Sequence, residues 1–426
     1  MRIGQIVLDV APLRESRDFR WLYAGRLVWN TGEVVAITAA NWQVYALTRS
    51  PIAVGLLSLT SSVGMLASVL AGGMLADRYD RRKLLLATGL PQALLAAGLM
   101  ANAMLRHPAL WAIFVITLAM GMLAGLGSPA ATAATPALVG PSRLPAAAAL
   151  NGMGNQLGNL AGPPIAGGLI AGPGLAVCYG VDTACFAAFG LALLFLRPLP
   201  PTVRAQRPGL RSLAEGFRYV RHSGVLGGML LIDTSAMIFG MPAALFPALA
   251  TEHFHGGSAT FGVLAAAPGV GALAGAATSG WTSRVRRPGM VIIGAGLVWG
   301  GAIVGFGLTR SLPVALAFLA LAGMGDMISE ILRNALLQIY APDRLRGRLS
   351  SLYLAQVTTA PALGNTEAGI AAQLFSVTAS VVSGGLACVA GALLLGALIP
   401  ALRHATLAGP APGHAPATPP VPEPAD

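Results

Sequence analysis

A set of ionisable residues lies inside long apolar segments of this sequence. An ionisable side chain in such a segment is energetically costly and usually functional. A carboxylate that is partly removed from water can exchange a proton near neutral pH or hold a cationic group. The set therefore indicates proton or substrate binding within the apolar part of the chain. Its members are Arg26, Glu33, Asp182, Asp233, Asp326, Glu330, Arg333 and Glu367.

Arg26, Asn30 and Glu33 follow one another at helical spacing, so their side chains share one face of a helix. Arg26 has an alternative role, because it comes soon after Arg20 and its long side chain could reach the membrane surface. Glu33 lies too deep in the apolar segment for that role. We therefore expect Glu33 to have a functional role.

Asp326, Glu330 and Arg333 share a face of a second helical segment. Glu330 lies one turn before Arg333 and is expected to pair with it, which would leave Asp326 or Asp233 as the freer carboxylate. A fixed structural ion network is the alternative. Asp182 is interpreted as local hydrogen-bonded structure, and so is Glu367, although Glu367 could also face a cavity.

The segments that carry these residues are long enough to cross a membrane as helices. The chain has 426 residues, of which 55% are hydrophobic and 10% are charged, with a mean hydropathy of +0.70. Such a composition is too apolar for a soluble protein of this length. We predict an all-α membrane protein with twelve transmembrane helices, each long enough for a hydrocarbon core of about 30 Å. Their expected ranges are 20–46, 52–75, 84–104, 110–138, 147–171, 175–196, 224–250, 259–281, 289–309, 312–339, 350–374 and 377–401.

Cationic residues concentrate on one expected side of the membrane. They lie before the first helix, after the second, in the central linker and at 284–287 and 344–348, whereas the opposite loops hold only Arg49, Arg106 and Arg310. Cytoplasmic loops carry such an excess, so both termini are predicted to be cytoplasmic. This asymmetry explains the net charge of +11 without any nucleic-acid partner.

The predicted helices fall into two sets of six. The expected divisions are a cytoplasmic N-terminus (1–19), an N-terminal bundle (20–196), a cytoplasmic linker (197–223), a C-terminal bundle (224–401) and a disordered cytoplasmic tail (402–426). Within the linker, 210–221 has apolar residues at helical spacing and predicts an amphipathic helix. An offset of 207 positions aligns Gly64 with Gly271 and Gly73 with Gly280. The similarity favours two parallel six-helix repeats.

The link between the second and third predicted helices, residues 72–83, reads Gly-Gly-Met-Leu-Ala-Asp-Arg-Tyr-Asp-Arg-Arg-Lys. It resembles the loop 2–3 signature of the major facilitator superfamily, with Asp80 near the place of a usual glycine. A generic cytoplasmic loop would explain the cations but not the glycine, leucine and aspartate at this spacing. The matching residues are Gly73, Leu75, Asp77, Arg78, Arg81, Arg82 and Lys83.

The resemblance implies a transporter that works by alternating access. Helices 1, 4, 7 and 10 line the central cavity in this superfamily, and most of the ionisable residues above fall on helices 1, 7 and 10. The signature also implies a cytoplasmic gate built from charge pairs and a helix N-terminus. Its expected residues are Gly73, Asp77, Arg78, Arg81, Arg82 and Arg348.

Two further resemblances favour export. Pro164, Gly167 and Gly168 match the end of the antiporter motif of exporters, with Pro163 replacing a glycine, although glycine and proline are also common in ordinary membrane helices. Segments 134–140, 246–250 and 345–348 resemble the branch that contains the enterobactin (siderophore) exporter and multidrug effluxers. We therefore expect a bacterial inner-membrane exporter of a siderophore or amphipathic drug, acting as a monomer and coupled to protons.

Two alternatives stay open: a proton-coupled uptake symporter and an integral-membrane enzyme. The sequence has no phosphate-binding glycine loop, which argues against an ATP-driven pump. All six histidines lie in expected loops or the tail, so neither a metal site nor a cofactor is predicted within the membrane.

The predicted orientation can be tested by cysteine labelling in intact cells. In a background without the native Cys178, Cys185 and Cys388, a cysteine at Gly256 should react with an impermeant maleimide, because this loop is expected outside. A cysteine at Thr202 should react only after the membrane is permeabilised. The reverse pattern would overturn the orientation.

Overall fold

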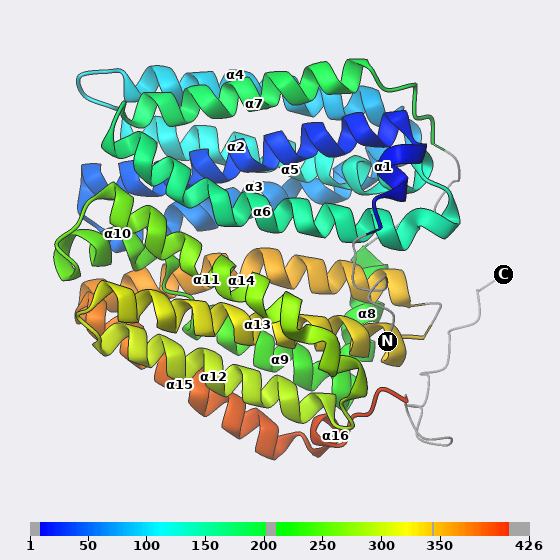
Figure 1. Cartoon of the computed structure of the whole chain (residues 1–426), viewed down its shortest axis with the longest axis vertical. Helices are drawn as coiled ribbons and strands as arrows, with labels where there is room; N and C mark the ends of the chain where they lie inside the picture. Colours follow the sequence, from blue (N-terminus) through cyan, green and yellow to red (C-terminus); the bar gives the residue numbers. More distant parts are fainter. Residues whose placement is uncertain (1–8, 202–209, 343–344, 409–426) are drawn as a thin grey trace.

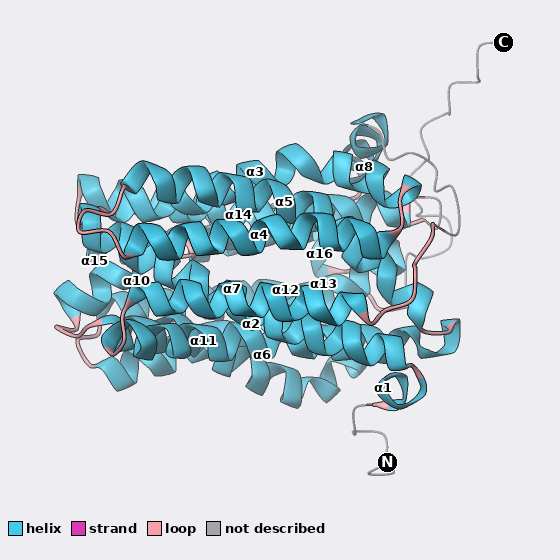
Figure 2. Cartoon of the chain, turned by 90° about the horizontal axis from the view of Figure 1, so that it is seen from above, coloured by secondary structure: helices cyan, strands magenta, loops and turns pink. Residues whose placement is uncertain are grey.

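The computed structural model describes residues 9–201, 210–342 and 345–408 (Figure 1). The regular structure of these residues is entirely helical, as predicted for an all-α protein (Figure 2). The long helices are α2 (Arg17–Thr48), α3 (Pro51–Arg78), α4 (Arg81–Ala103), α5 (Leu110–Leu138), α6 (Leu144–Ala171), α7 (Leu175–Leu194), α9 (Gly224–Phe239), α11 (Ser258–Thr278), α12 (Pro288–Leu308), α13 (Leu312–Tyr340), α14 (Arg346–Leu374) and α15 (Val377–Leu398). The shorter ones are α1 (Ala11–Glu15), α8 (Leu210–His222), α10 (Phe246–Ala248) and α16 (Pro400–Arg403).

The chain is a multi-pass membrane protein. In the part that the structure describes, nine helical segments are long and apolar enough to cross a membrane. Helices α2, α6 and α14 have the length but are more polar, and α2 carries Arg26 and Glu33. Such polarity suits helices that face protein or water rather than lipid. The count of twelve spans stays a prediction.

Two groups of helices lie side by side in Figure 1, with α2–α7 in one group and α9 and α11–α15 in the other. The groups meet where α3 packs along α14 and α6 packs along α11. Helix α8 covers the whole predicted amphipathic segment, 210–221, and packs against α9 and α14. The expected linker and tail lie partly outside the described residues, and the repeat relationship between the groups stays a prediction.

Close packing between the two groups gathers at the end of the molecule opposite α1 and α16 (Figure 1). A Cβ atom added at Gly167 of α6 would lie 2.6 Å from the Ser258 carbonyl oxygen of α11. One added at Gly369 of α14 would lie 2.7 Å from Cα of Ile52 in α3. Glycine lets helix backbones approach this closely, so these positions fix the contact between the groups.

The expected continuous helix over 224–250 is broken. Helix α9 ends at Phe239, and the chain resumes helical structure after Pro242. Proline lacks an N–H for the helix ladder, so other groups must satisfy the freed backbone atoms. Trp299 of α12 donates to the Gly240 carbonyl at 3.0 Å, and Ala244 N donates to Asn365 of α14 at 2.9 Å. Side chains of two neighbouring helices therefore stabilise the break.

The antiporter-like segment provides a matched test of this packing. Gly167 is buried against α11, whereas Pro164 and Gly168 are exposed and a Cβ atom at Gly168 would have no neighbour within 4 Å. We expect Gly167→Ala to destabilise the fold by about 1–3 kcal/mol through overpacking. Gly168→Ala should behave like wild type. Thermal unfolding of the two purified variants in the same detergent checks this, and equal melting temperatures would contradict it.

Candidate functional site

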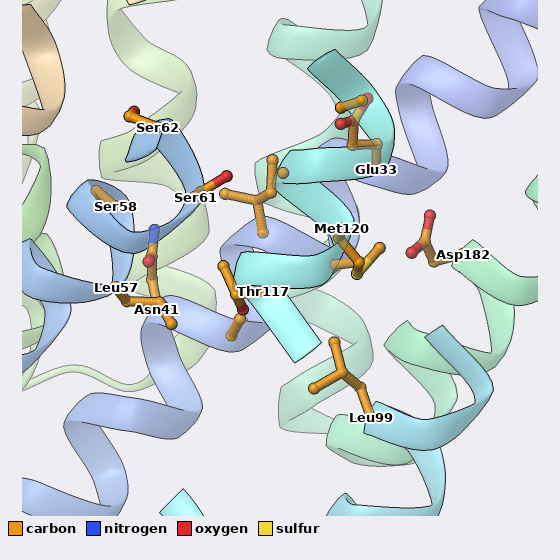
Figure 3. Close-up of a pocket in the computed structure, with 15 residues that line it drawn as sticks. Glu33, Asn41, Leu57, Ser58, Ser61, Ser62, Leu99, Thr117, Met120 and Asp182 are labelled. Atoms are coloured by element: carbon orange, nitrogen blue, oxygen red, sulfur yellow. The ribbon is translucent and has the colours of Figure 1, made fainter. Parts of the chain in front are cut away.

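The first cavity lies inside the α2–α7 group and has a volume of about 230 Å³ (Figure 3). Two carboxyl groups line it, Glu33 from α2 and Asp182 from α7. Hydroxyl groups of Ser58 and Ser61 on α3 and Thr117 on α5 line it as well. Its described lining contains no arginine, lysine or histidine. The cavity is therefore suited to a proton or a positively charged group rather than to an anion.

The second cavity lies in the other group of helices, between α9, α12 and α13, and has a volume of about 80 Å³. Asp233, Asp326 and Arg333 line it together with the apolar Met237 and Trp299. The structure thus places five of the eight predicted ionisable residues in these two cavities, one cavity in each group of helices.

Arg333 is the centre of an ion network in the second cavity. Its guanidinium lies 2.7 Å from a carboxylate oxygen of Asp233 and 3.3 Å from one of Asp326. It also donates to Ser329 at 2.9 Å, while Gln356 of α14 donates to Asp233 at 3.0 Å. Arg333 and Asp233 are nearly fully buried, so each charge depends on the other for its compensation.

The pairing differs from the sequence-based expectation, which placed Glu330 beside Arg333. Asp233 on α9 takes that place, because the packing of α9 against α13 brings it closer than a residue one turn away on the same helix. Glu330 has no ion pair among the described residues. Glu330 rather than Asp233 is therefore the freer carboxylate of this group.

The environment of Asp182 contradicts the expectation that this residue belongs to local hydrogen-bonded structure. Its side chain is fully buried, but neither carboxylate oxygen has a hydrogen-bond partner in the described part of the chain. Its neighbours are engaged elsewhere: Thr183 donates to the Tyr179 carbonyl at 2.9 Å, and the Tyr179 hydroxyl donates to Gln43 at 2.6 Å. The sequence offered one signal, an acid in the middle of an apolar segment, and we had assigned that acid a structural role.

The remaining predicted residues of the translocation set take varied positions. Asn30 lies against α6, where it donates to the Asn155 carbonyl at 3.4 Å. Arg26, Glu330 and Glu367 are half-buried and line neither of the two cavities described above. Their roles in transport stay predictions.

The gate signature forms the end of α3 and the start of α4. Asp80 caps α4 by accepting from Lys83 N at 3.0 Å, which explains its place in the turn where the signature usually has glycine. A Cβ atom at Gly72 would lie 2.5 Å from the Gly125 carbonyl oxygen of α5, whereas Gly73 faces open space. Gly72 therefore provides the close helix approach at this point.

The charged residues of the predicted gate have separate partners. The backbone N–H of Arg81 donates to the Leu199 carbonyl at 3.0 Å, so it holds the segment that follows α7. The Arg82 side chain donates to the Leu194 carbonyl at 2.9 Å, so it holds the end of α7 itself. Arg348 at the start of α14 pairs with Glu215 of α8. Arg78 is exposed, and Asp77 has no ion pair with the described residues.

Two ion pairs connect α1, α2 and the segments around them at the end of the molecule near the N-terminus. Arg143 donates to Glu15 at 3.0 Å, and Arg197 lies 3.3 Å from Asp18. Hydrogen bonding to Glu15 raises the pKa of the Arg143 guanidinium, so this pair stays charged. Exposed pairs of this kind contribute little stability. Both pairs join residues of the N-terminal group of helices.

The network around Arg333 predicts an asymmetric response to mutation. Replacing Arg333 with methionine leaves Asp233 buried without its cation, which should destabilise the fold by about 3–5 kcal/mol. Adding Asp233→Asn removes the uncompensated charge and should recover much of the loss. Thermal unfolding of the single and double variants measures the coupling. Additive effects of the two substitutions would show that the pair has no structural role.

Comparison with known proteins identifies the family of this chain. The profile of the transmembrane secretion effector family matches residues 8–417. The enterobactin exporter EntS of Citrobacter koseri is 33% identical over 410 residues, covering 96% of this chain and 98% of that protein. EntS of Escherichia coli K12 is 34% identical over 399 residues, covering 93% and 95%.

Solved structures share the fold at low identity. A POT family transporter in complex with 5-aminolevulinic acid has a TM-score of 0.72 at 13% identity, covering 91% of this chain and 97% of its own. An inward-facing bacterial homolog of the human lysosomal transporter Spinster has a TM-score of 0.69 at 15% identity, covering 91% and 95%. The relatives are transporters and not enzymes. The chain belongs to the transmembrane secretion effector family of the major facilitator superfamily.

Proposed function

We propose that this protein is a secondary active transporter that exports a small molecule from the bacterial cytoplasm by alternating access. The observation that carries the proposal is the pair of cavities with ionisable linings, one in each group of helices. Close packing between the groups at the end opposite α1 and α16 supports a conformation open toward the end that carries these two helices. With cytoplasmic termini, this is a cytoplasm-facing state that can accept a substrate.

A siderophore or an amphipathic drug is the proposed substrate. Relatives that cover nearly the whole chain are named as enterobactin exporters, which favours a siderophore. The cation-free lining of the first cavity favours a neutral or positively charged compound, which suits an amphipathic drug. An uptake symporter remains the alternative, because solved structures of similar fold include a complex of a POT family transporter with 5-aminolevulinic acid.

Proton entry is the proposed energy source. The sequence has no nucleotide-binding loop, so a gradient must supply the energy. One elementary charge that crosses the membrane supplies about 2.3 kcal/mol per 100 mV, which is enough to bias a rocking motion of two helix groups. Acidic side chains that are neutral in one state and ionised in the other would couple this energy to the substrate. Glu33 and Glu330 are the first candidates for this exchange, since Asp233 and Asp326 both lie beside Arg333.

The loop 2–3 signature, residues 72–83, has a proposed role in the conformation that is closed at the cytoplasmic end. Helices α3 and α14 pack along each other, and Arg348 lies in the first turn of α14. When the groups close at the cytoplasmic end, Asp77 is proposed to move to the N-terminus of α14 and to the Arg348 guanidinium. Both would attract a carboxylate. In the conformation described here Arg348 is held by Glu215 instead.

The cellular setting follows from the same proposal. We place the protein in the inner membrane, with both termini and the linker on the cytoplasmic side, acting as a monomer on a small molecule, protons and the lipid bilayer. No nucleic acid, metal or cofactor is part of the proposal.

Transport by the purified protein in liposomes tests the proposal. Protein molecules whose cytoplasmic side faces out of the liposome should drive accumulation of a catecholate siderophore or an amphipathic amine when a pH gradient is imposed. A protonophore should abolish this accumulation. Liposomes with the Asp77→Asn variant should show slower transport at equal protein content. Undiminished accumulation with the protonophore would refute proton antiport, and transport only with the opposite gradient would favour the uptake symporter.

A further inference from the structure

Two buried aspartates of this protein have opposite environments. Asp233 is 2% exposed and lies 2.7 Å from the Arg333 guanidinium, with Gln356 donating to its other oxygen. Asp182 is 0% exposed, with no hydrogen-bond partner for either oxygen among the described residues and no basic residue in the lining of its cavity. An isolated ionised carboxylate in such a place would cost far more than a protein's net stability. A proton on Asp182 would remove this cost in the conformation described here.

Gly32 brings the Asp182 carboxyl group to the side of Glu33. A Cβ atom added at Gly32 would lie 3.2 Å from an oxygen of Asp182 and 2.6 Å from Cβ of Cys185, so only glycine leaves room for α7 here. Glu33 is the next residue on α2, and both carboxyl groups line the same cavity. Figure 3 shows the Asp182 side chain pointing away from α7 toward this cavity.

We propose that Glu33 and Asp182 form a proton-binding pair in the N-terminal group of helices, with Asp182 holding a proton in the described conformation. The proposal rests on the proposed proton antiport and assigns its proton site to a pair outside the Arg333 network. Glu33 is only half-buried, so it can pass a proton between Asp182 and water in the cavity. The proton binds one carboxylate oxygen on one side of the membrane and returns to water on the other, and no other bond changes.

The groups around the pair support a neutral site. On α7 the titratable neighbours are Tyr179, whose hydroxyl donates to Gln43, and Cys185. On α2 the nearest cation is Arg26, two turns before Glu33 and outside the cavity lining. Helices α3, α4 and α5 contribute hydroxyl, sulfur and apolar groups to the lining, and α6 contributes none of its residues. A proton is therefore the simplest counter-charge that the surroundings allow.

Infrared spectroscopy of the purified full-length protein tests the pair without any substrate. A pH titration of wild type should show the carbonyl band of a buried protonated carboxyl group. The band should be lost in Asp182→Asn and lost or shifted in Glu33→Gln. Asp326→Asn is the matched control and should keep the band, because Asp326 lies beside Arg333 in the other group of helices and its loss leaves the Asp233–Arg333 pair in place. A band that persists unchanged in both Asp182→Asn and Glu33→Gln would overturn the proposal.

Asp182→Asn should fold, because the carboxyl group that it replaces makes no hydrogen bond, and thermal unfolding checks this. Glu33→Gln tests the same pair from the other helix if the first variant unfolds. In liposomes, both variants should lose accumulation driven by a pH gradient but keep downhill exchange of substrate. Accumulation at the wild-type level in Asp182→Asn, or accumulation driven by a sodium gradient alone, would contradict the assignment. If no tested compound is transported, the proposed function fails while the infrared titration still decides on the proton pair.

Discussion

A charge buried between apolar helices needs an opposite charge or a proton, and this constraint connects the main features of the structure. In the C-terminal group the chain satisfies it with Arg333, which lies between Asp233 and Asp326. In the N-terminal group, the described lining of the cavity that contains Asp182 has no basic residue. The cost of burying a charge is thus met by an ion network in the C-terminal group of helices and, in our proposal, by a proton on Asp182 in the N-terminal group.

This asymmetry suggests different roles for the buried carboxyl groups in the two groups of helices. A carboxylate that pairs with a fixed cation is stabilised in its ionised form, and the Asp233–Arg333 pair joins α9 to α13. A carboxyl group without a cation can change its protonation state when the surroundings change. Proton exchange is therefore more readily built on Glu33 and Asp182, while the Arg333 network is better suited to structure or to substrate orientation.

Glycine packing allows the two groups to move as units. Gly167 against α11 and Gly369 against α3 bring backbones into contact at the end opposite α1 and α16. Contacts through small residues involve little side-chain interlocking, so in the proposed alternating-access cycle they would open as the other end closes. The pair between Arg348 and Glu215 connects this motion to α8, because Arg348 would have to leave Glu215 to reach Asp77. Two carboxylates would then compete for one guanidinium in alternate conformations.

The sequence by itself determined the class of the protein and the location of its helices. Apolar segment lengths gave α5 its observed bounds, and the motif between α3 and α4 indicated the superfamily, since both depend only on local composition and spacing. Tertiary structure decided which charges meet. Glu330 was expected beside Arg333 because they are neighbours on one helix, but Asp233 from α9 lies there instead. The break after α9 also depends on Trp299 and Asn365, which come from other helices. Spacing along one helix predicts which residues are neighbours on that helix. Whether a buried acid such as Asp233 or Asp182 has a cation beside it depends instead on the residues that other helices place next to it, which only the packing decides.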